Sequence, residues 1–285
     1  MNPVGNSFSD WDLDSEIADA ISNKGWTIPT DIQVEAIPVA RAGRDVVGQA
    51  RTGSGKTAAF GIPIIEACQA TGSPQAIVLC PTRELAVQVA EEISWLQGGL
   101  GMSVQTVYGG TDIEKQAKLL DKGADIIVGT PGRVIDMAKR GHLKLADIRR
   151  FCLDEADRML DMGFFPDVLW IFDQMPAREQ TMLFSATFPQ EVLDAAEEFM
   201  DDPVFVMSDD LEVEIPEIEI TVSLADGEIH LSWGASPAAS YTVRSSNSVA
   251  GPYTPVGKKL KFDDSTGSFS AKADRAAQFF IIQAK

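Results

Sequence analysis

The segment A-R-T-G-S-G-K-T at Ala50–Thr57 constrains the fold more than any other part of this chain. It follows the short apolar run Val46–Gln49 and precedes a stretch with helical spacing. Gly53 and Gly55 let the main chain bend so that successive N–H groups converge on phosphate oxygens, and the N-terminus of the next helix adds partial positive charge. A strand, a glycine loop and a helix in this order predict an α/β fold with a phosphate site, although a chance glycine-rich turn is an alternative.

Short apolar runs alternate with longer helical patterns through residues 1–207. This alternation predicts βαβ units, and hence a parallel sheet with helices on both faces. Pro63 lies inside the helix expected after Thr57, so we expect a kink or an early helix end there. The expected strands are Asp45–Gln49, Ala76–Cys80, Val104–Tyr108, Asp125–Gly129, Phe151–Asp154, Thr181–Ser185 and Val204–Met207, and the expected helices include Thr82–Gln97 and Gln190–Met200.

The pattern changes after Asp209, where short strand-like runs are separated by turn sequences and no helical spacing is evident. Such a pattern predicts a small antiparallel β-sandwich. The chain is therefore expected to contain an ATP-binding α/β domain at 1–208, an acidic linker or first edge strand at 209–223, and a β module at 224–285. The strands expected in the module are Ile229–Trp233, Tyr241–Ser245, Tyr253–Val256, Leu260–Phe262, Ser268–Ala271 and Phe279–Gln283.

The glycine loop carries side chains suited to binding a nucleoside triphosphate. Lys56 is expected to reach the β- and γ-phosphates, and the Thr57 hydroxyl is expected to ligate Mg²⁺. Ala50 stands where the common pattern has its first glycine, and the strand–loop–helix context supports the motif despite this difference. The residues predicted to bind the nucleotide here are Arg51, Thr52, Gly53, Ser54, Gly55, Lys56 and Thr57.

The string D-E-A-D at Asp154–Asp157 ends another apolar run. The carboxyl ends of neighbouring parallel strands meet at the ligand crevice of an open sheet. Asp154 can hold Mg²⁺ through water there, and Glu155 can orient the water that attacks the outermost phosphate. Alone, the string could be a solvated acidic loop; together with the phosphate loop, it predicts an ATP site.

The overall charge limits how this chain can contact nucleic acid. The formal net charge is −18 and the sequence pI is about 4.4, whereas nucleic-acid binders are usually basic. Any such contact must therefore be local. The 3 cysteines lie among apolar residues and favour reduced core thiols. With neither a signal-peptide pattern nor an apolar run of membrane-spanning length, we expect a cytoplasmic protein without membrane contact.

Residues 1–207 resemble the N-terminal lobe of the DEAD-box ATP-dependent RNA helicases, which implies that the parallel sheet is a RecA-like sheet of the P-loop type. The segment G-W-T-I-P-T-D-I-Q at Gly25–Gln33, with Phe8 upstream, is similar to the adenine-reading motif of that family. The resemblance implies that Phe8, Thr27 and Gln33 bind the nucleotide. An amide that donates and accepts at once suits the edge of adenine. Trp26 either adds flat apolar surface to this motif or is a core aromatic residue.

Three further segments resemble the RNA-backbone contacts of the family: P-T-R-E-L-A at Pro81–Ala86, the Gly109-Gly110 pair, and T-P-G-R at Thr130–Arg133. Each follows an expected strand, so they should gather at one edge of the sheet. Main-chain N–H groups, hydroxyls and arginines bind phosphate and sugar without reading bases. The residues implied to bind RNA are Pro81, Thr82, Arg83, Gly109, Gly110, Thr130, Gly132 and Arg133.

The segment S-A-T at Ser185–Thr187 resembles the part of the family that links hydrolysis to movement between two lobes. The resemblance adds Ser185 and Thr187 to the catalytic set of Lys56, Asp154 and Glu155. We expect the hydroxyls of Ser185 and Thr187 to form hydrogen bonds with the region of Asp157.

In the family a second RecA-like lobe follows, with further RNA contacts and arginine fingers worth roughly 10³–10⁵ in rate. No H-R-I-G-R-x-x-R-like string follows Thr187. We therefore expect this chain alone to bind ATP and some RNA and to hydrolyse ATP at a rate near background. Unwinding of RNA would need a second lobe or a protein partner in trans.

The tail resembles fibronectin-type-III-like or immunoglobulin-like modules in L-S-W at Leu231–Trp233 and Y-T-V-R-S-S at Tyr241–Ser246. Such modules usually bind partners or space domains. Three readings stay open: an RNA-dependent ATPase or helicase completed in trans, a nucleotide-dependent module that binds RNA or protein, and a gene-fusion remnant without helicase activity.

Overall fold

The computed structural model divides the chain into two compact units, Met1–Glu212 and Val213–Lys285, and each is described here by itself. The residues that the structure describes are 7–208, 220–225, 228–234, 241–246, 254–260, 266–272 and 279–284.

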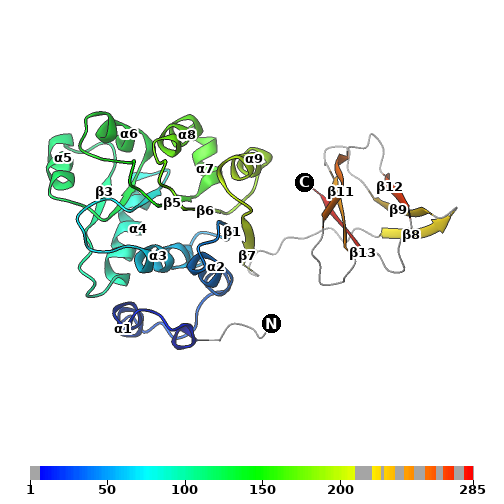
Figure 1. Cartoon of the computed structure of the whole chain (residues 1–285), viewed down its shortest axis with the longest axis horizontal. Coiled ribbons are helices and arrows are strands. Elements are labelled where there is room, and N and C mark those ends of the chain that lie inside the picture. Colours follow the sequence, from blue (N-terminus) through cyan, green and yellow to red (C-terminus); the bar gives the residue numbers. More distant parts are fainter. Residues whose placement is uncertain are drawn as a thin grey trace. The chain divides into compact units, whose positions relative to one another are not determined.

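The first unit is built on a 7-stranded sheet with the strand order β3-β4-β2-β5-β6-β1-β7 (Figure 1). Every neighbouring pair is parallel, which confirms the predicted parallel sheet. Because the order brings β1 beside β6 and β6 beside β5, the strand ends that carry the phosphate loop and D-E-A-D lie close together. The strands are β1 (Val46–Gln49), β2 (Ala76–Leu79), β3 (Val104–Val107), β4 (Ile126–Gly129), β5 (Arg150–Asp154), β6 (Gln180–Ser185) and β7 (Val204–Met207).

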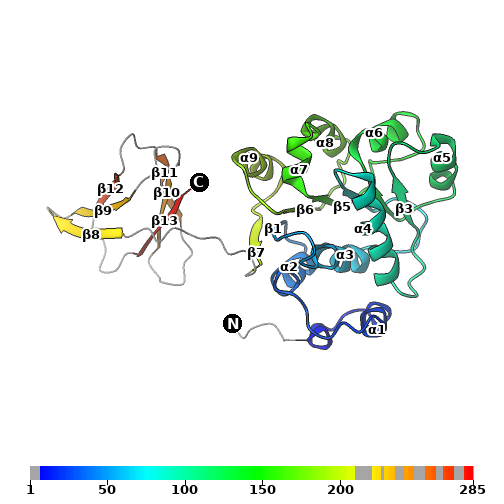
Figure 2. The ribbon, with the colours of Figure 1, turned by 180° about the vertical axis from the view of Figure 1, so that it is seen from behind.

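The sheet separates two hydrophobic cores. Val46 belongs to the core that the first four α-helices cover, and the next residue, Val47, belongs to the core that the last five cover. Successive side chains of a strand point to opposite faces, so a sheet buried on both sides needs nearly continuous apolar strands. Figures 1 and 2 show α2 and α3 on one side of the sheet and α6 to α9 on the other. The predicted covering of both faces is thus confirmed.

Helix starts in this unit follow local rules. Thr82 caps α4 by accepting the N–H of Leu85, and Asp112 caps α5 by accepting the N–H of Glu114. The described residues contain no helix long and apolar enough to cross a membrane. The helices are the 3₁₀-helix η1 (Phe8–Trp11), α1 (Ser15–Asn23), α2 (Asp31–Arg41), α3 (Lys56–Ala67), α4 (Arg83–Leu96), α5 (Ile113–Asp121), α6 (Pro131–Lys139), α7 (Ala156–Asp161), α8 (Phe165–Asp173) and α9 (Gln190–Phe199).

Helix α3 passes through Pro63 and ends only at Ala67, so the expectation of an early helix end at Pro63 is wrong. A proline inside a helix removes one main-chain hydrogen bond. Phe60 and Ile64, on either side of Pro63, are 0% exposed. Burying each such side chain contributes about 1.5–3 kcal/mol, and this burial outweighs the lost bond.

In the second unit, the described residues form two antiparallel 3-stranded sheets with the orders β12-β9-β8 and β11-β10-β13. The packing of these sheets into a sandwich, and the likeness to fibronectin-type-III modules, stay predictions. Residues 209–219 of the expected acidic linker lie outside the described residues. The strands are β8 (Ile220–Ala225), β9 (Glu228–Gly234), β10 (Tyr241–Ser246), β11 (Thr254–Leu260), β12 (Thr266–Lys272) and β13 (Phe279–Ala284).

The described strands of this unit differ from their expected bounds by one or more residues, and β8 and β11 show the largest differences. Strand β8 runs across the boundary expected between residues 223 and 224, and it pairs with β9 through register partners such as Val222 and Leu231. Strand β11 is continuous where two short strands were expected. It contains Pro255, which is compatible with a strand at the edge of a sheet because that residue has no N–H to donate.

Candidate nucleotide and RNA site

The phosphate loop connects the end of β1 to the start of α3. Gly53 and Gly55 have φ of 84° and 89°, which favours glycine at both positions. A Cβ at Gly55 would lie 2.5 Å from Nε2 of Gln33, so the loop also needs glycine there for space. Ala50, the departure from the common motif, is 0% exposed, and its N–H donates to the carbonyl of Ser185 at 3.1 Å. The loop is thus attached to the neighbouring strand end.

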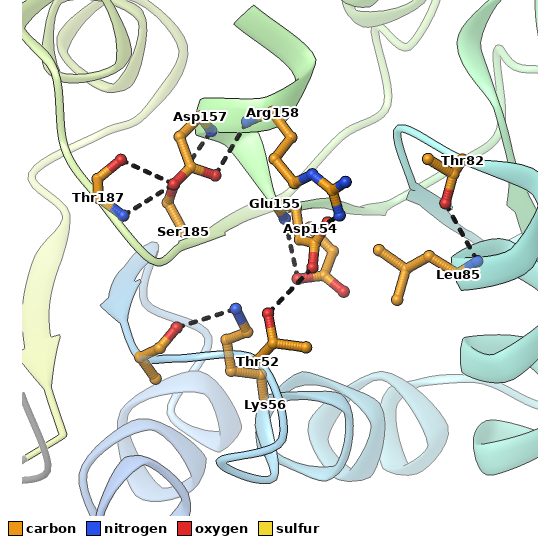
Figure 3. Close-up of polar contacts among 11 residues, drawn as sticks. Thr52, Lys56, Thr82, Leu85, Asp154, Glu155, Asp157, Arg158, Ser185 and Thr187 are labelled. Atoms are coloured by element: carbon orange, nitrogen blue, oxygen red, sulfur yellow. Dashed lines mark hydrogen bonds and ion pairs between the residues drawn. The ribbon is translucent and has the colours of Figure 1, made fainter. Parts of the chain in front are cut away.

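Lys56, the first residue of α3, is only 6% exposed. Its Nζ donates to the carbonyl of Ala50 at 2.9 Å, across the loop (Figure 3). The Ser54 hydroxyl is buried and has no hydrogen-bond partner in the described part of the chain. A buried ammonium and an unsatisfied hydroxyl at a helix N-terminus fit an anionic ligand such as a nucleotide phosphate. Thr57 follows in the first turn of α3, half-buried, while Arg51 is exposed.

Gln33, predicted to read adenine, is 2% exposed and lies against the phosphate loop. Its Oε1 accepts the N–H of Thr30 at 3.0 Å, and its Nε2 donates to the carbonyl of Gly55 at 3.1 Å. A primary amide has a second N–H and a second lone pair, so a base edge can still be accommodated. Sequence reasoning missed this link between the two motifs.

The other predicted base contacts lie at different depths. Phe8 is 6% exposed and packs edge-on against Trp11 and stacked against Trp26, with ring centroids 5.2 and 6.2 Å apart. Phe8 is therefore a core residue in this structure, and little of its ring is available to a base. The half-buried Trp26 packs against the same core, which was one of its two readings. Thr27 is exposed at the surface.

Strand β5 delivers Asp154 and Glu155 to the loop. Asp154 is 2% exposed, and burial raises its pKa to about 6, with Lys56 opposing the shift. Glu155 is 5% exposed and adopts a left-handed backbone, with φ of 52°. Its Oε1 accepts from the Thr52 hydroxyl at 3.4 Å, and its Oε2 lies 2.9 Å from Nη1 of Arg158 (Figure 3). The carboxylate is thus held between the phosphate loop and α7.

The predicted hydrogen bonds near Asp157 are present. Thr187 donates to the Asp157 carboxylate through its N–H at 2.9 Å and its hydroxyl at 2.8 Å. The Ser185 hydroxyl accepts the N–H of Asp157 at 3.0 Å. Burial by itself raises the pKa of Asp157, but the hydrogen bonds of Thr187 and Ser185 reverse that effect and lower the pKa below its usual value. The end of β6 is therefore tied to the first turn of α7.

The predicted RNA-contact segments gather around residues 108–112, the connection between β3 and α5. The Arg83 guanidinium lies 5.8 Å from the centroid of the Tyr108 ring. Nη1 of Arg133 donates to Oε1 of Gln116 at 3.0 Å and to the carbonyl of Thr111 at 3.3 Å. Gln116 in turn donates to the carbonyl of Tyr108 at 3.0 Å. Two arginines from different helices therefore lie beside the same loop.

The smaller members of the predicted RNA site line the same strand ends. Gly109 and Gly110 are exposed in this loop, and Gly110 has φ of 80°. Thr130 is the N-cap residue of α6, and Gly132 is exposed in its first turn. Thr82 is half-buried at the N-cap of α4, whereas Pro81 is buried and has little surface for a ligand.

Three residues of this site were missed. Arg158 could have been found, because residues three apart on a helix face each other and it follows Glu155 at that spacing. Tyr108 and Gln116 carry no local signal, because their partners Arg83 and Arg133 come from other helices.

Comparisons with known proteins agree with this geometry. Residues 30–195 match the family model described as DEAD/DEAH box helicase. The DEAD-box ATP-dependent RNA helicase CshA of Geobacillus kaustophilus is 45% identical over 214 residues, which cover 75% of this chain and 46% of that protein. The chain thus spans about half the length of the curated relative.

Two solved structures share the fold. A DEAD box protein from the hyperthermophile Methanococcus jannaschii matches with a TM-score of 0.68 and 46% identity, over 71% of this chain and 56% of that one. A hypothetical ATP-dependent RNA helicase from Sulfolobus tokodaii matches with a TM-score of 0.65 and 37% identity, over 69% and 57%. With a family match over more than half of its length and a RecA-like sheet that carries the motifs at its strand ends, the chain belongs to the DEAD/DEAH box helicase family.

Proposed function

We propose that this chain is an ATP-binding lobe that contacts RNA backbone and supplies the catalytic half of an RNA-dependent ATPase. The observation that carries this proposal is the contact between Thr52 of the phosphate loop and Glu155 at the end of β5. It places a carboxylate beside the loop that would hold the terminal phosphate. A carboxylate that acts on a water must lie within hydrogen-bond reach of the reacting group, and this arrangement supports that role.

In this proposal different residues bind the phosphates, hold Mg²⁺ and orient the attacking water. Gly53, Ser54 and Gly55 would present main-chain N–H groups to the phosphates, and Lys56 would leave Ala50 to bind the terminal ones. Thr57 and Asp154 would hold Mg²⁺, which when bound neutralises charge on the phosphate oxygens. Glu155 would orient the attacking water.

RNA would be held at the neighbouring strand ends. Arg83 is exposed, and Arg133 borders the same loop. Together with Thr82, Gly109, Gly110, Thr130 and Gly132, these residues can bind phosphate and sugar oxygens, so binding would not depend on base sequence. Ser185 and Thr187, bonded to Asp157, would link this lobe to the movement of a second lobe.

A second candidate function is nucleotide-dependent binding without turnover. It is favoured by the state of Glu155, since each carboxylate oxygen already has a protein donor. In either case a second RecA-like lobe or a protein partner would act in trans. The C-terminal strands would form a fibronectin-type-III-like module that docks or spaces the lobe.

The deciding experiment measures ATP affinity by calorimetry, and ATP turnover with and without single-stranded RNA, on the 285-residue chain. We expect ATP binding, very slow turnover, and no strand displacement on a short RNA duplex. Failure to bind ATP would contradict the proposal. Strand displacement that disappears in Glu155→Gln would contradict only the need for a second lobe.

A further inference from the structure

Arg158 is the one cation that the structure shows in contact with Glu155, among the residues described. The distance from Nη1 of Arg158 to Oε2 of Glu155 is 2.9 Å. The Glu155 side chain is 6% exposed, whereas that of Arg158 is 59% exposed. A solvent-facing arginine therefore holds a buried carboxylate.

The second oxygen of this carboxylate is engaged as well. Oε1 of Glu155 accepts from the Thr52 hydroxyl at 3.4 Å. A carboxylate that orients a water needs an oxygen pointing at that water. In this structure one oxygen accepts from the phosphate loop and the other from the guanidinium, so each oxygen already has a protein donor in the place where a water would bind.

The first turn of α7 joins this pair to the end of β6. Asp157 precedes Arg158 in that turn and is held by Thr187 and Ser185 (Figure 3). A contiguous set of polar contacts therefore runs from Thr187 through α7 to Glu155 and the phosphate loop. Glu155 is the N-cap residue of α7 and Arg158 lies in its first turn, so the pair belongs to the same element that Thr187 and Ser185 hold.

We propose that Arg158 is a positioning residue. Its ion pair with Glu155, which we call the latch, holds the carboxylate in a resting orientation. Nucleotide can bind in this state, but hydrolysis requires that the arginine first move away from Glu155. The inference rests on the proposed ATPase function and deepens it. Because the guanidinium is largely exposed, an anionic group such as an RNA phosphate can draw it away. The nucleotide itself makes no contact with the latch in this scheme, so ATP affinity should not depend on it.

The test is single-turnover hydrolysis of γ-labelled ATP, with the chain in excess, together with ATP affinity by calorimetry. Arg158→Gln should raise the hydrolysis rate constant about tenfold, which corresponds to about 1.4 kcal/mol, and leave ATP affinity unchanged. Arg158→Lys keeps the charge and should stay near the parent rate. A purely structural role would not separate rate from affinity in this way.

Two controls define the result. The first is Arg140→Gln, which removes an exposed arginine at the end of α6 whose Nε lies 2.9 Å from Oδ1 of Asp136. This variant should hydrolyse ATP at the rate of the parent chain. The gain from Arg158→Gln should vanish when Glu155→Gln is added. A slower or unchanged rate in Arg158→Gln, including no measurable hydrolysis, would overturn the latch. A parent chain that fails to bind ATP would overturn the proposed function, and the latch with it.

Discussion

The first unit has two proposed binding sites: a nucleotide edge made by the loops after β1 and β5, and an RNA edge made by the loops after β2, β3 and β4. They lie at the carboxyl ends of different strands of one sheet, and their side chains differ in exposure to water. Lys56, Asp154 and Glu155 are 6%, 2% and 5% exposed. The Arg83 side chain, at the RNA edge, is 52% exposed. The first group consists of buried charges, whereas Arg83 is a cation at the surface.

This difference teaches what each ligand requires. Buried charges act through a low local dielectric, so the loss of one leaves its partner desolvated and has a large effect. Exposed cations meet a polyanion through screened interactions that add up and depend on salt. Substitutions at the two edges should therefore differ in size and in salt dependence.

The largest expected effect is that of Lys56→Ala at the nucleotide edge. Truncating one partner of a desolvated charge pair costs about 2–5 kcal/mol, so ATP affinity should fall by about 30-fold to several thousand-fold. Calorimetry with ATP measures this loss. Lys139→Ala is the matched control, because Lys139 is exposed and lies over the Trp170 ring at 5.2 Å. Equal ATP affinities in Lys56→Ala and the parent would break the comparison.

The next effect concerns two buried aspartates. The raised pKa of Asp154 means that the folded chain binds a proton more tightly than the unfolded chain does. Its contribution to stability therefore declines as pH rises from about 4 through about 6. Asp154→Asn should stabilise the fold by about 1–3 kcal/mol at pH 7, with the gain shrinking toward pH 4. Urea unfolding at both pH values measures it.

Asp125→Asn is the matched control for that prediction. Asp125 is 2% exposed, and its carboxylate accepts the main-chain N–H groups of Thr71, Gly72 and Ser103. An amide has only one acceptor oxygen, so Asp125→Asn should destabilise the fold by about 1–3 kcal/mol at pH 7. If Asp154→Asn and Asp125→Asn lowered the free energy of unfolding by the same amount, the charge of Asp154 would not destabilise the folded chain, and this prediction would be wrong.

Smaller effects are expected at the RNA edge. Arg83→Ala and Arg133→Ala should each reduce RNA affinity several-fold and lower the slope of log affinity against log salt by about 1. The reason is that each arginine would neutralise about one phosphate. Fluorescence anisotropy with a short single-stranded RNA at several salt concentrations tests this. Arg140→Ala removes an arginine whose side chain is 50% exposed, close to the 52% of Arg83, and which lies outside the proposed RNA site. An identical loss there would argue against a local RNA site.

The smallest expected effect is that of removing the second unit. A chain ending at Ser208 retains all strands of the parallel sheet, since β7 ends at Met207. It should fold and bind ATP and RNA with affinities within about twofold of the full chain, because the whole parallel sheet and every residue of the proposed sites belong to the first unit. Circular dichroism and the same two binding assays check this. A truncated chain that no longer binds ATP would show that the second unit supports the nucleotide site.

Much of the first unit was predictable because its signals are local or periodic. The seven parallel strands coincide with apolar runs, and the two cores follow from the alternation of side chains along them. The hydrogen bonds of Thr187 and Ser185 to Asp157 were also expected. Of the two outcomes expected at Pro63, the early end of α3 was wrong, because burial on both sides of this proline outweighs its local cost, and the kink stays a prediction.

The groups that this chain can offer a ligand were readable from its residues: a glycine loop with Lys56, an acidic strand end with Asp154 and Glu155, and arginines after the neighbouring strands. The contacts among these groups came only from the folded chain. Gln33 contacts Gly55, Phe8 enters the core, and Gln116 connects Arg133 to the loop after β3. Residue type and spacing report what a segment can do locally. Contacts between segments distant in sequence depend on strand order and side-chain packing, which no single segment specifies.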